Sequence, residues 1–195
     1  MNDLVERTID FLEKQSLAQG LLYLSEGGGN LQTLPAVSDT VFVGSVFFME
    51  KFARLVQKDI ISRSLEGGKL FINFQSFAKV ARRAASLLEV DKLQNEVYVY
   101  GADEVTEWPF SRFKRVTLTR GDRLLGSWFI IYWKGDSAYS LVAVEEEAPA
   151  GSERTPIPNR GRFRGFWTTR PSVAHYLADY LLRVVNAQYS TEPPK

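Results

Sequence analysis

The residues best suited to chemistry flank a long polar segment between residues 145 and 162. Glu145–Glu147 supply carboxylates, and Arg162 and Arg164 supply cations. If Glu145 and the two arginines lie close together, they could act on an anionic, phosphorylated small molecule, because guanidinium groups bind phosphate in a bidentate fashion. Carboxylates alone could hold a divalent cation. However, a run of charges at a strand end before a Pro/Gly-rich loop is more typical of a solvated sheet edge.

The single histidine does not predict a catalytic or metal site. The chain has no cysteine, which excludes thiol catalysis and cysteine zinc sites. His175 lies on the polar side of a predicted helix, and Asp179 follows four residues later, so we expect an exposed ion pair. No Ser-His-Asp arrangement is evident. We predict no catalytic residue and no metal site, and the sequence leaves any cofactor unknown.

Two other stretches match binding motifs only in part. Gly27–Gly29 follows a predicted strand but lacks the Lys-Ser/Thr pair of a P-loop and the spacing of a dinucleotide fingerprint, so we expect a flexible loop. Arg162–Trp167 alternates basic and aromatic residues, but Trp167 stands where the RNA-recognition signature needs a small residue. With 24 Lys+Arg against 23 Asp+Glu, the chain has no overall attraction for polyanions. We predict no nucleic-acid partner.

Aromatic residues on predicted strands are the remaining candidates. Such rings either fill a core or line a pocket, and the sequence leaves both readings open. Because α/β proteins usually bind ligands at the ends of their strands, residues near strand ends become candidates for ligand binding. These are Gln75, Trp128, Arg162 and Trp167. The structural alternatives are that Gln75 caps a backbone group and that Trp167 packs under the last helix.

In the first half of the chain, the elements that would position these residues alternate between helix and strand. Capping-box spacing at Asp3 and Glu6 predicts a helix to about Gly20. We expect a strand at 21–24, a loop at 25–30, and a strand or helix lead-in at 41–43. Residues 49–60 have helical periodicity, with Gly67-Gly68 as the stop. A strand at 69–74 and one helix capped by Ser76, with Leu87 and Leu88 on its inner side, follow.

The second half is richer in strands. Residues 97–100 are apolar on both faces and predict a central strand, and 116–118 a short one. Residues 128–133 and 139–144 predict a hairpin closed by Lys134–Ser137. A mobile loop is expected at 145–161, then an aromatic strand near Phe166. Pro171 begins a last helix whose core face is Val173, Leu177, Tyr180, Leu181 and Val184.

These elements predict one α/β domain over residues 1–187, with a disordered tail at 188–195. The expected architecture is a mixed β-sheet flanked by helices, with the C-terminal helix packed on the sheet. At 195 residues, one core suffices. No apolar run is long enough for a membrane span, and no signal peptide is evident, so we expect a cytoplasmic protein without membrane contact.

Four segments, in order, resemble the DICT sensory domain family, which occurs with diguanylate cyclases and two-component proteins. They are Phe71–Gln75, Val97–Gly101, Trp128–Ile131 and Phe163–Thr168, within a match from about residue 40 to residue 187. The family pattern has a strand ending in Phe-Gln before a helix and a Gly-aromatic-Trp-Thr turn before the last helix. Its members are usually fused to output domains, and we expect none within these 195 residues.

The resemblance implies a non-catalytic signalling domain that binds a small ligand or a partner protein. It would relay a signal through contact with a partner protein or through homo-oligomers. It supplies no ligand or catalytic residues to carry over. Two alternatives remain from the residues themselves: the enzyme described above, and an interaction or scaffold domain without a ligand.

Overall fold

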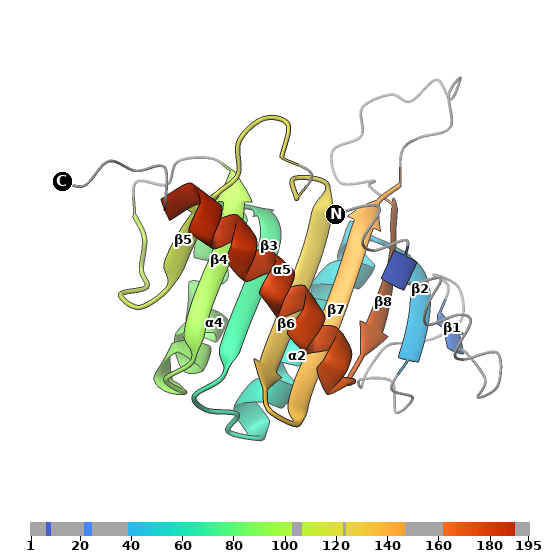
Figure 1. Ribbon diagram of the computed structural model, residues 1–195, viewed down its shortest axis with the longest axis horizontal. Helices are drawn as coiled ribbons and strands as arrows, with labels where there is room; N and C mark the ends of the chain where they lie inside the picture. The colour runs from blue at the N-terminus through green and yellow to red at the C-terminus, as the bar shows by residue number, and fades with distance from the viewer. Residues whose placement is uncertain are drawn as a thin grey trace.

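The computed structural model describes residues 7–8, 22–24, 39–102, 107–122, 124–146 and 162–189. In this part of the chain, one mixed eight-stranded sheet carries α5 on one face and α2, α3 and α4 on the other (Figure 1). The strands are β1 (Leu22–Leu24), β2 (Asp39–Ser45), β3 (Lys69–Ser76), β4 (Glu96–Ala102), β5 (Lys114–Thr117), β6 (Ser127–Lys134), β7 (Ser137–Glu145) and β8 (Arg162–Thr168). The helices are α2 (Val46–Ser62), α3 (Phe77–Ala81), α4 (Ala84–Lys92) and α5 (Pro171–Tyr189).

The strand order is β1-β2-β8-β7-β6-β3-β4-β5. The pairs β1/β2, β3/β4 and β4/β5 are parallel, and the four pairs from β2 through β8, β7 and β6 to β3 are antiparallel. This confirms the predicted α/β class, the mixed sheet and the C-terminal helix packed on it. The β6–β7 hairpin is also confirmed, and Gly135 supplies the positive φ (55°) of its turn.

Side-chain alternation along the strands divides the core between the two faces. On β6, Trp128, Ile130 and Tyr132 face α2, whereas Phe129 and Ile131 face α5. All five are fully buried. Burying a large apolar side chain stabilises a fold by about 1.5–3 kcal/mol, so the aromatic residues that suggested a pocket in the sequence mainly build this two-sided core.

One predicted helix is two. The segment after Ser76 breaks at Arg82–Arg83 into α3 and α4, and the Ser76 side chain makes no capping hydrogen bond. The two parts pack on different partners: α3 covers the ends of β3 and β4, whereas α4 lies against α2. One straight helix could not pack against both the strand ends and α2. Leu88, predicted on the inner side, is consequently exposed.

Other boundaries also differ from the sequence prediction. Helix α2 ends at Ser62, before Gly67, because the backbone turns left-handed at Ser64 (φ 49°) and the Leu65 amide then donates to the Ile60 carbonyl at 3.1 Å. Residues 39–45 form a full strand, and β4 lies one strand from the edge rather than at the centre. Helix α5 continues to Tyr189, into the predicted tail. Most of the first helix and the loops at 25–30 and 147–161 lie outside the described residues.

A half-buried hydrogen bond between the sheet and α2 makes stability sensitive to alkaline pH. The Tyr139 hydroxyl donates to Asp59, and burial together with this carboxylate raises the pKa of Tyr139. A raised folded-state pKa means that the contribution is complete below the unfolded pKa, near 10, and is lost as the pH rises above it. The protonated phenol therefore stabilises the fold at neutral pH.

We expect Tyr139→Phe to lower the free energy of unfolding at pH 7 by about 1–2 kcal/mol, through loss of this hydrogen bond. At pH 10.5 the deficit should shrink by about 0.8 kcal/mol, because the unfolded tyrosine of the wild type then gains from ionising. Urea unfolding of both proteins at the two pH values measures this. An equal deficit at both pH values would contradict the assignment.

Candidate functional site

Strand β3 ends in an irregular turn at Gln75. The β3/β4 register shifts between Asn73 and Ser76, which marks a bulge, and Gln75 has a φ of 70°. The Gln75 amide donates to Asn73 Oδ1 at 2.6 Å. A non-glycine residue in this region is strained by about 1–3 kcal/mol and is held there only by its surroundings. Gln75, predicted to bind ligand, is thus fixed at the mouth of the turn into α3.

A buried asparagine provides that hold. Asn73 is fully buried, and its Nδ2 donates to the Leu124 carbonyl at 2.8 Å and to Ser127 Oγ at 3.3 Å. Ser127 is the first residue of β6 and Leu124 lies three residues before it, so one side chain ties the Gln75 turn to the neighbouring strand. The position of the Gln75 side chain therefore depends on this asparagine.

Lys79 reaches from α3 over the edge of the sheet. Its Nζ donates to Gln75 Oε1 at 3.2 Å and lies 5.7 Å from the centroid of the Trp128 ring. Burial lowers the pKa of Lys79, and the charges of Glu145 and Glu50 oppose this shift only in part. The ammonium group is thus partly desolvated, a condition under which a cation gains from a further anionic neighbour.

Arg83, at the junction of α3 and α4, also lies over this ring. Its guanidinium carbon lies 5.8 Å from the Trp128 ring centroid and 4.8 Å from that of Phe74. Nη2 pairs with Glu50 Oε1 of α2 at 3.0 Å. Nη1 is buried and has no acceptor among the residues that the structure describes. One half of the guanidinium fork is satisfied and the other is not.

Trp128 forms the floor beneath the two cations. The side chain is fully buried, edge-on to Phe163 (5.8 Å) and tilted against Phe74 (5.3 Å). Its Nε1 is also a buried donor without an acceptor in the described part of the chain. A ligand cannot stack on this ring, since Lys79 and Arg83 lie over it. We call Glu50, Gln75, Lys79, Arg83 and Trp128 the Trp128 site.

A further donor lies on the seam between α2 and α4. Gln57 is 3% exposed, and its Nε2 has no acceptor among the described residues. The Ser86 hydroxyl lies 3.4 Å from Gln57 Oε1 and 3.0 Å from the Arg83 carbonyl. Unsatisfied buried donors are rare in native structures, and each leaves a desolvation penalty of about 1–3 kcal/mol. Gln57 Nε2 and Arg83 Nη1 are two such donors where α2 packs on α4 and the α3–α4 junction, which favours acceptors there.

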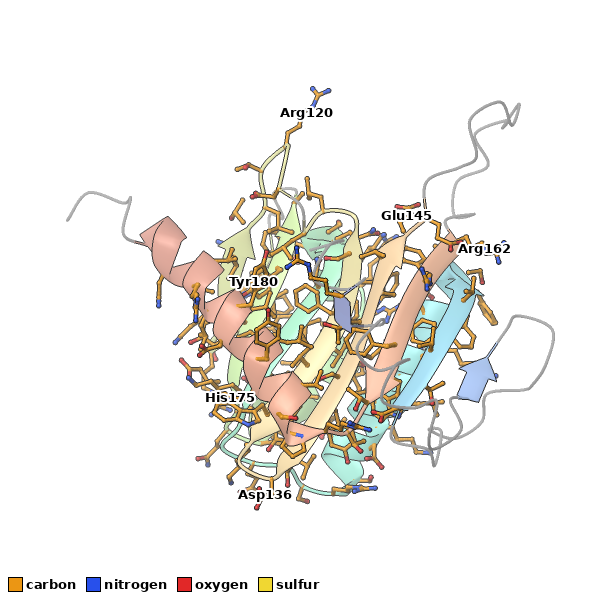
Figure 2. The ribbon with its side chains drawn as sticks, turned by 45° about the vertical axis from the view of Figure 1, so that its right-hand side comes forward. Arg120, Asp136, Glu145, Arg162, His175 and Tyr180 are labelled. Carbon is orange, nitrogen blue, oxygen red and sulfur yellow. The ribbon has the colours of Figure 1, made fainter. Side chains whose placement is uncertain are left out.

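The other two predicted ligand residues lie elsewhere. Trp167 is 1% exposed and packs beneath α2 against Phe52 and Tyr139, not under the last helix. Arg162 is solvent-exposed at the start of β8 and pairs with Glu146 at 3.1 Å. Figure 2 shows Glu145 and Arg162 at the same end of the two neighbouring strands, where β7 ends and β8 begins. Only Gln75 and Trp128 are brought together.

The residues of the possible enzyme site, Glu145, Arg162 and Arg164, lie on different faces of the sheet. Glu145 follows the alternation of Leu141 and Ala143 on β7 and falls on the α2 side, near Lys79. On β8, Phe163 faces α2 and Phe166 faces α5. Arg162 and Arg164 lie on the same side of the strand as Phe166, which is the α5 side. The predicted carboxylate–arginine cluster therefore does not form on one face.

His175 lies away from the strand ends that carry Glu145 and Arg162. Its ring stacks on Trp133 at 4.5 Å with an interplanar angle of 23°, near the β6–β7 turn (Figure 2). The ion pair that Asp179 forms is with Arg183, at 3.3 Å, rather than with His175 as predicted. Within the described ranges, no group of three or more His, Asp or Glu side chains is placed to hold a metal ion.

Sequence reasoning missed Lys79, Arg83 and Glu50. A signal was present: Lys79 and Arg83 are four residues apart in a segment with helical periodicity, directly after Gln75. We used only the apolar residues of that segment, as the buried face of a helix, and gave its charged residues no role. Glu50 carries no comparable signal, because its proximity to Arg83 depends on how α2 and α4 pack together.

Comparisons with known proteins leave the family open. The sequence matches no protein-family model and no curated protein. A solved structure with a similar chain path is polyphosphate kinase from Porphyromonas gingivalis, at 12% identity and a TM-score of 0.46. The match covers 74% of this chain and 23% of the kinase, so the chain spans under a quarter of that protein. The resemblance to DICT sensory domains stays a prediction.

No helix in the described ranges combines the length and apolar character needed to cross a bilayer.

Proposed function

We propose that this protein is a non-catalytic sensory domain, of the kind that the resemblance to the DICT family implies, and that it binds a small ligand at the Trp128 site. The observation that carries the proposal is a pair of buried donors, Trp128 Nε1 and Arg83 Nη1, that have no acceptor among the described residues, with Lys79 Nζ lying over the Trp128 ring. A ligand that presents hydrogen-bond acceptors would satisfy both.

The position of the site suits signalling. Its side chains come from β3, β6, α3, the α3–α4 junction and α2, so a ligand would contact several elements at once. Helix α3 has only five residues and is joined to α4 by a break. A small shift of α3 on binding would change the outer surface there, which a partner protein or a second copy could recognise.

The proposal predicts a specific response from one indole. In a ¹H–¹⁵N spectrum, the Trp128 Nε1–H resonance, assigned with Trp128→Phe, should move on addition of a bound metabolite, because a new acceptor changes the shielding of that proton. Trp167 Nε1 is the internal control, since it is also buried without an acceptor in the described chain but lies under α2. We expect Lys79→Met to weaken binding about tenfold, through loss of a charge-assisted hydrogen bond of about 1.4 kcal/mol.

Native mass spectrometry of the purified protein, followed by a metabolite panel of mixed charge, supplies the ligands for that titration. If no compound of any charge moves the Trp128 resonance, or if both indoles move together, the binding proposal is wrong. If the protein converts a compound instead of returning it unchanged, the enzyme alternative replaces the sensory one.

A further inference from the structure

We infer that the group recognised at the Trp128 site is an anion, a carboxylate or a phosphate, which binds Arg83 by displacing Glu50. This inference rests on the proposed ligand-binding function and adds two things to it: the chemical class of the ligand and the contact that binding breaks. It follows from the charge of the site, from the exposure of the two partners in the ion pair, and from the geometry of the guanidinium group.

The charge around the site favours an anion. The charged groups that act on Lys79 and Arg83 come from α2, α3, the α3–α4 junction and β7. The cations are Lys79, Arg83, Arg54 and Arg82, and the carboxylates are Glu50 and Glu145. Among these groups positive charge is in excess even with the Arg83–Glu50 pair intact. A cationic ligand would meet repulsion here, and a neutral one would leave the excess uncompensated.

The two partners of the ion pair differ in their access to water. The Arg83 side chain is only 14% exposed, whereas the Glu50 side chain is 37% exposed. Losing its anionic partner without a replacement would leave Arg83 as a buried unpaired charge, which is strongly unfavourable. Glu50 can instead turn into solvent and regain its hydration. An incoming anion can therefore exchange with Glu50, whereas Arg83 must stay and be paired.

The guanidinium geometry favours the exchange. Glu50 engages Nη2, and the acceptor-free Nη1 stands beside it. A carboxylate or phosphate has several acceptor oxygens in the spacing that a guanidinium fork binds in a bidentate fashion. Such a ligand would satisfy both nitrogens. Lys79 Nζ and the Arg83 guanidinium carbon lie 5.7 and 5.8 Å from the centroid of the same Trp128 ring, so the ligand could also meet the lysine charge and the indole donor.

The displacement also has a mechanical consequence. The Arg83–Glu50 pair joins α2 to the α3–α4 junction across the surface of the domain. When an anion takes the place of Glu50, this tether opens while Arg83 remains bound in the site. Ligand binding would thus loosen α2 from the junction, which gives the proposed signal a physical route from the site to the surface.

The test is a titration of the Trp128 Nε1–H resonance with inorganic phosphate and, separately, with succinate, each at constant ionic strength set with sodium chloride. In the wild type at least one anion should give a saturable shift that chloride does not give, and the more effective anion identifies the source of the oxygens. Glu50→Gln should bind that anion about fivefold tighter, because the competing ion pair is gone. Arg83→Lys should bind it at least about tenfold more weakly, because the bidentate fork is lost.

Arg63→Gln is the control, since Arg63 forms an exposed ion pair with Asp59 on the same helix as Glu50 and should leave the affinity unchanged. Unchanged or weaker anion binding in Glu50→Gln would overturn the inference, and this variant decides the matter even if Arg83→Lys fails to fold. A Trp128 response to uncharged compounds, with none to phosphate or succinate, would overturn the anion assignment alone and leave the proposed function standing.

Discussion

Replacing Gly165 with alanine should lower the free energy of unfolding by about 3 kcal/mol or more, among the largest effects of any single methyl group in this chain. A Cβ at this position of β8 would lie 2.2 Å from the Val142 carbonyl oxygen and 2.6 Å from Ala143 Cβ. Both belong to β7, the hydrogen-bonded neighbour of β8. The clash involves backbone, so the two strands would have to separate to relieve it.

Gly126→Ala is the matched control for this prediction. Nothing lies within 4 Å of a Cβ added at Gly126, and its φ is not positive, so we expect a change within about 0.5 kcal/mol. Urea denaturation of the two variants measures both effects. If the free energy of unfolding of Gly165→Ala lies within about 1 kcal/mol of that of the wild type, β7 and β8 do not approach as closely as described.

The strand that contains Gly165 shows why part of the sheet could be predicted from the sequence. Gly165 lies in the segment Arg162–Trp167, whose basic and aromatic residues predicted a strand from local pattern alone. The β6–β7 hairpin was predicted for a similar reason, since two apolar runs flank a turn with a glycine. Such signals lie within about ten residues of sequence, and periodicity reads them well. The order of the eight strands is set by contacts between distant segments, which no local pattern contains.

The helix after Ser76 shows where periodicity misleads. Its apolar spacing is regular across the break, because Phe77 and Val80 bury against the sheet and Leu87 and Val90 against α2. A pattern of buried positions records that a residue is covered, but not by which neighbour. The break at Arg82–Arg83, which brings the Arg83 guanidinium over Trp128, therefore has no signature in the sequence.

The predicted ligand residues divide on similar grounds. Gln75 and Trp128 were chosen because they lie at strand ends, and the antiparallel pairing of β3 with β6 brings those two ends together. Trp167 and Arg162 met the same criterion but lie on β8, where α2 covers the first and solvent surrounds the second. Position along a strand was readable from the sequence, whereas the neighbours across the sheet were not.

The second large effect is expected at Asn73, the residue that holds the Gln75 turn. Asn73→Ala should lower the free energy of unfolding by about 3 kcal/mol, because it removes two buried hydrogen bonds and a half-buried one, which leaves the Gln75 amide without its acceptor. It should also move the Trp128 Nε1–H resonance without any ligand, since Gln75 then no longer positions Lys79 over the indole.

Asn95→Ala separates these two consequences. Asn95 is buried in the same way, accepting from the Gly68 amide at 2.8 Å and donating to the Leu65 carbonyl at 2.9 Å, but it precedes β4 at the opposite end of the β3 and β4 strands. We expect a loss of about 2 kcal/mol and no change at Trp128. If both variants move the Trp128 resonance equally, general loosening of the fold explains the shift. If only Asn73→Ala does so, the turn at Gln75 is what holds the cations over the indole, and ligand affinity should fall in that variant alone.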